Sequence, residues 1–226
     1  MIEEIKKWIK DNSSNKLQSF SNGLIPNSAP IYGVKIPILR QKAKEICKMD
    51  YETFLQECDK SSLEITLLEA YVIAQAKMSF EQRTKYLDDF VPHIGDWAVN
   101  DGLVSSLKCI KKDLASWYQY ILKYQFSIEE FEVRFLCIVL MSYYLVDDYI
   151  DNVLNLLKTL QYNGYYAKMG VAWLLATAMA KYETKTLKLL EEYKFDKEII
   201  NMTISKIRQS FRVSDETKDY VLKFKN

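Results

Sequence analysis

Apolar and polar residues follow a helical period along almost the whole chain. The clearest example spans 94–112 and reads IGDWAVNDGLVSSLKCIKK. At about 100° per residue, its core stripe consists of Val99, Leu103, Leu107 and Ile110. Gly95 interrupts the preceding pattern, and Asp96 suits the N-cap position. The sequence therefore predicts one helix over 97–112.

The opposite side of this predicted helix carries Trp97 and Asp101, four residues apart, together with lysines at 108, 111 and 112. Residues spaced by four are neighbours on a helix surface. An indole and a carboxylate held side by side on a basic face, away from the core, are typical of a docking site. The alternative is that Trp97 packs on a neighbouring helix and Asp101 is a solvated acid. This helix alone supports both interpretations.

The same period predicts helices in pairs after residue 35. The expected pairs are 36–48 with 51–59, 62–77 with 80–92, 97–112 with 114–123, 128–145 with 148–161, 164–181 with 183–193, and 196–210 with 214–225. Residues 1–22 predict one or two further short helices, and 21–40 is the only long irregular segment. The expected capping residues are Asp50, Ser61, Ser79, Ser127, Asp147, Asp196 and Ser214. A helix-pair period of about 30–36 residues is typical of an α-solenoid of the HEAT or armadillo kind, so we expect one all-α domain over 1–226.

Composition excludes several classes of site. The four cysteines show no CxxC spacing, and His93 is the only histidine. His-based triads and His-rich metal sites need more imidazoles than this, so we expect no metal. No run of about 18 apolar residues is present, so we expect a cytoplasmic protein without a membrane span. We also expect a monomer.

Charge is unevenly distributed although the net charge is only +1. Residues 1–48 contain nine Lys or Arg against four Asp or Glu, and residues 201–226 contain six against three. Basic ends on an acidic middle suggest a polyanion held by one surface. Lysine-rich helices that are simply well solvated would give the same pattern.

Three later helices carry candidate groove residues. Arg134 lies about 60° from the core stripe of FEVRFLCIVL, where it can reach solvent or contact a phosphate. Trp173 belongs to a nearly all-apolar helix, which favours core packing, and Lys168 is the one early charge of that helix. Near 210, a basic cluster either lines a groove or complements a helix dipole; it consists of Lys206, Arg208 and Arg212.

Five segments of the chain resemble the DNA alkylation repair proteins, a family of HEAT-like DNA glycosylases of the AlkD type. In chain order they are YGVKIPILRQKAKEI, DWAVND, FEVRFLCIVL, YYAKMGVAWLLATAMAKY and KIRQSFRVSDETK, and the resemblance runs from about residue 31 to 220. Each segment alone is weakly specific, whereas five in order at matching separations are specific.

The resemblance implies a right-handed α-solenoid of HEAT-like helix pairs that binds duplex DNA in a basic groove. It implies hydrolysis of the N-glycosidic bond of N3- and N7-alkylated purines, without base flipping and without a cofactor. Trp97 and Asp101 match the family's aromatic and acidic catalytic pair, and Trp173 matches its second cleft tryptophan. The expected DNA-binding residues are Arg134, Lys168, Arg208, Arg40, Lys35 and Arg212.

The chemistry suits these residue types. An alkylated purine is cationic and leaves readily, so a carboxylate that stabilises the developing sugar cation and orients a water is sufficient. Two functions nevertheless stay open, because Lys35 replaces a glutamine of the active members and Ala98 replaces a common acid. The first is the glycosylase. The second is a non-catalytic HEAT-like protein, either a DNA-binding paralogue or a protein-interaction scaffold.

Overall fold

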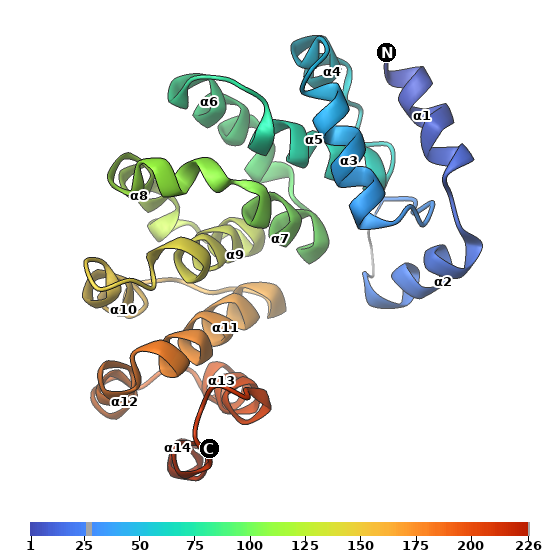
Figure 1. Ribbon diagram of the computed structural model, residues 1–226. Helices are drawn as coiled ribbons and strands as arrows, with labels where there is room; N and C mark the ends of the chain where they lie inside the picture. Colours follow the sequence, from blue (N-terminus) through green and yellow to red (C-terminus); the bar gives the residue numbers. More distant parts are fainter. Residues whose placement is uncertain (26–28, 226) are drawn as a thin grey trace. The chain divides into compact units, whose positions relative to one another are not determined.

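A computed structural model describes residues 1–25 and 29–225, and this part of the chain is helical with no strand (Figure 1). The predicted all-α class is confirmed. The described residues form two compact units, Met1–Lys112 and Asp113–Asn226. The single domain over 1–226 stays a prediction. The expected irregular segment 21–40 begins later than predicted, after α2, and its residues 26–28 lie outside the described part of the chain.

Unit 1 is built around the apolar helix α5. Its helices are α1 (Ile2–Asp11), α2 (Asn15–Leu24), α3 (Ile36–Ile46), α4 (Tyr51–Glu57), α5 (Leu63–Gln75), α6 (Phe80–Phe90) and α7 (Trp97–Ser106), with 3-10 turns at Val91–His93 and Lys108–Lys112. Helix α5 packs against α3 on one side and α7 on the other, and α4 and α6 also contact it. Because α5 is covered from several directions, every residue from Leu63 to Ala74 except Thr66 is buried.

Unit 2 repeats this arrangement around α11. Its helices are α8 (Leu114–Ile121), α9 (Glu130–Val139), α10 (Ile150–Leu156), α11 (Tyr165–Lys181), α12 (Glu183–Glu192), α13 (Lys197–Gln209) and α14 (Asp215–Tyr220). A 3-10 turn follows α8 at Leu122–Phe126, and another follows α14 at Val221–Phe224. A π-helical turn follows α9 at Leu140–Tyr144. Helix α11 lies between α9 and α13, and Figure 1 shows these three helices as neighbours.

Side-chain caps fix most helix starts. The carboxylates or hydroxyls of five expected residues accept a backbone N–H of the first turn; they are Asp50, Ser79, Asp96, Asp196 and Ser214. Three expected caps are wrong. Ser62 caps α5 instead of Ser61, Glu129 occupies the N-cap of α9 instead of Ser127, and Tyr149 occupies that of α10 instead of Asp147. The Asp147 carboxylate instead accepts a hydrogen bond from the Tyr182 hydroxyl at 2.8 Å.

The predicted helix over 97–112 is wrong in its second half. Helix α7 ends at Ser106, and the chain continues as a 3-10 turn. The hydroxyls of Ser105 and Ser106 both donate to the Gly102 carbonyl, at 3.0 and 2.9 Å, and so compete with the helix backbone for this acceptor. The predicted core stripe is still buried from Val99 to Ile110. The lysines of the turn, however, do not continue the helical face of Trp97 and Asp101.

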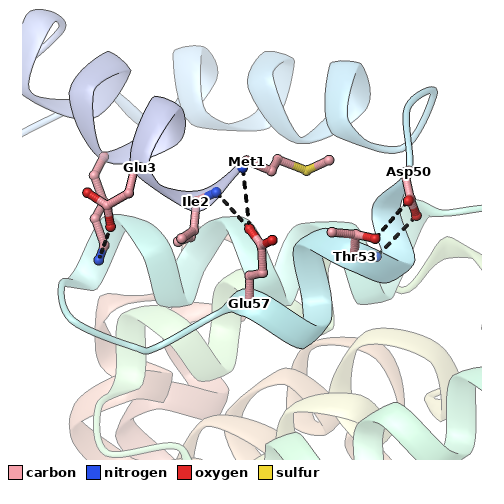
Figure 2. Close-up of polar contacts among 7 residues, drawn as sticks. Met1, Ile2, Glu3, Asp50, Thr53 and Glu57 are labelled. Atoms are coloured by element: carbon pink, nitrogen blue, oxygen red, sulfur yellow. Dashed lines mark hydrogen bonds and ion pairs between the residues drawn. The ribbon is translucent and has the colours of Figure 1, made fainter.

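Polar contacts anchor α1 to the end of α4. The Glu57 carboxylate accepts a hydrogen bond from the Ile2 amide at 2.9 Å and lies 3.4 Å from the Met1 amine (Figure 2). On the same helix, Asp50 accepts hydrogen bonds from the backbone and hydroxyl of Thr53 (Figure 2). Beneath these contacts, Ile5 and Ile9 are the buried residues of α1.

None of the described helices has both the length and the apolar character needed to cross a membrane.

Glu69 is a buried carboxylate in the middle of α5. Its only ion pair is with Lys60, at 3.5 Å, and its Oε2 atom has no hydrogen-bond partner in the described structure. Burial raises the pKa of Glu69 to about 7. The folded protein therefore binds this proton more tightly than the unfolded chain, so Glu69 favours folding at low pH and opposes it once ionised.

We expect stability to decrease through this residue as pH rises from about 4.5 to 7, by at most roughly 3 kcal/mol. Glu69→Gln should remove this dependence and make the protein more stable than wild type at pH 8. Melting temperatures of both proteins between pH 4.5 and 8 test this. Glu52→Gln, at an exposed position in the same unit, is the control. Parallel pH profiles for wild type and Glu69→Gln would contradict the prediction.

Candidate functional site

A pocket of about 670 Å³ opens in unit 1 between α2, the segment before α3, and helices α3, α5 and α7. Its wall is mainly apolar, with Leu17, Phe20, Leu24, Ile31, Val34, Leu39, Leu67 and Tyr71. Four residues predicted from the sequence also line it: Lys35, Arg40, Trp97 and Asp101. An apolar cavity with a few convergent charged groups is the usual form of a small ligand or substrate site.

Trp97 and Asp101 reach the pocket from the first two turns of α7. The Trp97 indole Nε1–H donates to the Leu24 carbonyl, at the end of α2, at 3.2 Å. The Asp101 carboxylate is half-buried and accepts a hydrogen bond from Asn100 Nδ2 at 3.0 Å. Asn100 is completely buried, and its Oδ1 atom has no partner among the described residues. Burying an amide oxygen without a partner costs free energy. The hydrogen bond from the Asn100 amide nitrogen to Asp101 offsets part of this cost.

Arg40 is held on the α3 side of the pocket by partners that the sequence does not reveal. Its guanidinium lies over the Tyr71 ring, 4.5 Å from the ring centroid, in a cation–π contact. It also donates to the hydroxyls of Ser106, at 2.6 Å, and Ser105, at 2.8 Å. The two serines that end α7 therefore also orient Arg40.

A buried carboxylate shapes the segment that carries Lys35. Glu64, at 2% exposure, accepts hydrogen bonds from the amides of Tyr32, Gly33 and Val34, at 3.0, 2.8 and 3.3 Å. Gly33 has φ +80°, and a Cβ there would lie 2.4 Å from the Gln18 amide nitrogen, so only glycine fits. The turn leaves Lys35 exposed at the N-cap of α3. Ile36 follows Lys35 at the rim of the pocket and is 43% exposed.

In unit 2, Trp173 is on the surface of α11, with 38% of its area exposed. The core packing favoured by the sequence is therefore wrong for this side chain. Two cations flank the ring, with Lys206 Nζ 5.6 Å and Arg134 Cζ 5.9 Å from its centroid. The sequence placed Lys206 only in a general basic cluster, so its contact with Trp173 was not predicted.

Arg134 does not lie on an accessible flank of α9. The residue is 3% exposed, and its guanidinium donates to the Tyr166 carbonyl at 3.1 Å. Helix α11 packs directly on α9 at Gly170, where a Cβ would lie 3.3 Å from the Cys137 Cβ and 3.5 Å from the Arg134 Cα. The structure thus buries the Arg134 guanidinium 5.9 Å from the ring centroids of both Tyr166 and Trp173. Its contact with DNA stays a prediction.

The other basic candidates of unit 2 have separate surroundings. Lys168 forms an ion pair with Glu198 of α13, and this hydrogen-bonded contact raises the pKa of Lys168. Arg208 and Arg212 are exposed, and Arg208 lines a groove of about 390 Å³ at the C-terminal end of α13. The structure therefore gathers four of the predicted residues in the pocket of unit 1. In unit 2 it brings Arg134 next to Trp173, and no contact joins Lys168, Arg208 or Arg212 to that tryptophan among the interactions of the described residues.

The described residues give little support for a cysteine nucleophile or a metal site. Burial raises the pKa of all four cysteine thiols, which disfavours a thiolate nucleophile. Over the ranges 1–25 and 29–225, no three His, Cys, Asp or Glu side chains group as a metal site. No protein-family model matches this chain, and no curated protein matches it either.

Proposed function

We propose that this protein is a cytoplasmic, monomeric DNA repair glycosylase that hydrolyses the N-glycosidic bond of N3- and N7-alkylated purines in duplex DNA. The observation that carries the proposal is the pocket of unit 1, where the Asp101 carboxylate and the Trp97 indole share a cavity with Lys35 and Arg40. This combination offers a carboxylate for a developing cation and cations for the phosphates on either side of it.

Asp101 has the chemistry that this reaction requires. The base of an alkylated purine nucleotide is already cationic, so it leaves without a strong acid, and the sugar becomes an oxocarbenium-like cation. A carboxylate beside the sugar stabilises that charge and orients the attacking water. Asn100 holds one carboxylate oxygen and leaves Asp101 pre-oriented. The reaction needs neither a metal nor an organic cofactor, because the leaving group is activated before it binds.

Trp97 and the two basic residues suit the binding of a nucleotide. An indole beside the sugar attracts the cation that forms there, by about 0.5–2 kcal/mol. Lys35 is exposed at the pocket rim and is placed to neutralise a phosphate. Arg40 is half-buried, and its bonds to two serines fix the direction of its guanidinium.

Unit 2 adds a surface suited to the DNA backbone. Trp173 is exposed beside Lys206 of α13, Arg208 is exposed near the end of that helix, and Arg212 is exposed in the turn that follows it. In this proposal the helix pairs of each unit are HEAT-like repeats of the right-handed α-solenoid type. Such repeats present a row of helices to one ligand, which fits a long polyanion.

The deciding experiment is to incubate the purified protein with duplex DNA that contains N7-methylguanine and to measure the free base. We expect release above the level of DNA alone, and DNA affinity that falls with salt by a log–log slope of about −0.9 per neutralised phosphate. Binding without any release would leave a non-catalytic DNA-binding protein. Absence of salt-dependent DNA binding would exclude both the glycosylase and the non-catalytic DNA-binding protein.

A protein-interaction scaffold is the second candidate, and one observation favours it. Apolar side chains at the pocket rim are exposed, with Phe20 at 65%, Leu24 at 49% and Ile36 at 43%. An apolar rim around an apolar pocket would also suit an amphipathic helix of a partner. A scaffold, however, gains nothing from a buried asparagine that orients Asp101.

A further inference from the structure

Phe211 is the most exposed large apolar side chain in the described part of the chain, with a relative exposure of 103%. It lies in the short turn between α13 and α14. Single exposed apolar residues are common, but a fully extended phenylalanine at the tip of a turn has no contact with its own fold. Its immediate chain neighbours, Ser210 and Arg212, are polar.

The turn that carries Phe211 is firmly anchored on both sides. Ile207, at the end of α13, and Val213, just before α14, are both buried. The Arg212 amide donates to the Ser210 hydroxyl at 3.2 Å, and Ser214 caps α14 by accepting from the Thr217 amide at 3.1 Å. The backbone of the turn is therefore anchored, and the Phe211 side chain projects from it into solvent.

Two exposed arginines lie close to Phe211 in the sequence. Arg208 precedes Phe211 by three residues and Arg212 follows it, and both are exposed with no ion pair to a described residue. Arg208 also lines the groove of about 390 Å³ together with Lys225 and the polar side chains of Asn201, Ser205 and Gln209. A groove with two cations and several neutral hydrogen-bonding groups matches the composition of sites that contact phosphate and sugar.

We propose that Phe211 is a wedge that enters duplex DNA between two base pairs, while Arg208, Arg212 and Lys225 hold the adjacent phosphates. The proposal rests on the proposed function, since it assumes that the protein binds DNA. Apolar wedges that partly unstack a base step and bend the duplex are a recurring device of minor-groove proteins. The turn favours nucleic acid over a protein partner, because Phe211 is its one exposed apolar residue in the described range 210–213 and Arg212 follows it directly.

The wedge is tested with a DNA duplex that contains 2-aminopurine, whose fluorescence rises when the base unstacks. Wild-type protein should raise this fluorescence at saturation. Phe211→Ala should bind with an affinity about tenfold lower and cause no such rise, because stacking against a base is lost. Phe211→Leu should retain part of the effect. The salt dependence of binding should be the same in all three proteins, since no charge changes.

Phe126→Ala is the matched control, because Phe126 is 74% exposed in the same unit but lies outside the basic turn. It should behave as wild type. If Phe211→Ala keeps wild-type affinity and fluorescence while wild type still releases alkylated base, the wedge is overturned and the glycosylase stands. If the wild-type protein binds no DNA, both the wedge and the glycosylase proposals are contradicted. Loss of self-association in Phe211→Ala, with DNA binding intact, would make the turn a protein contact and would also overturn the wedge.

Discussion

Asp101→Asn should slow the release of alkylated base by about a hundredfold, which corresponds to roughly 2.7 kcal/mol of transition-state stabilisation. The amide has the shape of the carboxylate but not its charge, so it cannot stabilise the sugar cation. The hydrogen bond from Asn100 can persist, because the new side chain still offers an acceptor oxygen. Asp101 is half-buried at the pocket and not in the core, so the melting temperature should hardly change.

Single-turnover release of N7-methylguanine, measured beside DNA affinity, separates catalysis from binding for this variant. Affinity should be equal or slightly higher, since a negative charge is removed near phosphates. Asp11→Asn, an exposed acid of α1, serves as the control and should keep both properties. Equal release by wild type and Asp101→Asn would disprove the catalytic role of Asp101.

Glu64→Ala should lower the free energy of unfolding of unit 1 by about 3 kcal/mol or more. The substitution leaves the amides of Tyr32, Gly33 and Val34 without their acceptor in a buried place. It should also weaken DNA binding, because the segment that positions Lys35 loses its anchor. Urea denaturation followed by tryptophan fluorescence measures the first effect, and titration with duplex DNA measures the second.

Glu64→Gln is the matched variant. It keeps one acceptor oxygen and the size of the side chain but loses the charge, so its stability loss should be clearly smaller than that of Glu64→Ala. If both variants unfold within 1 kcal/mol of wild type, on the order of a surface substitution, the carboxylate does not hold the segment.

Helix positions could be predicted closely because a buried stripe and a helical period are local properties of the sequence. From α3 to α14, each predicted helix overlaps an observed one. The errors lie at helix ends, where side chains compete with the backbone. The serine hydroxyls at the end of α7 bind Gly102, a choice that periodicity does not encode.

The candidate site could be predicted only in part. Trp97 and Asp101 are neighbours because one helix carries them, so their spacing was informative. Glu64 accepts hydrogen bonds from amides about thirty residues earlier in the chain, and Arg40 donates to serine hydroxyls more than sixty residues later. Such contacts depend on how helices pack and leave no local pattern. The exposure of Trp173 was missed for a related reason, since α11 is apolar on nearly all sides and its sequence does not mark the outward face.

Helix α2 forms a wall of the pocket but contributes no fully buried side chain. Its attachments to the rest of unit 1 include the bonds from Gln18 to the Ile31 carbonyl and from Trp97 to the Leu24 carbonyl. Segments with few buried apolar contacts open at lower free energy than the core and exchange their amide hydrogens first. We therefore expect this one wall to open locally while α5 and α7 stay folded around Asp101, and a ligand too large for the resting cavity to enter in this way. The same opening would release the Trp97 indole N–H from the Leu24 carbonyl, so access to the pocket and the freedom of its tryptophan would be coupled in one local equilibrium.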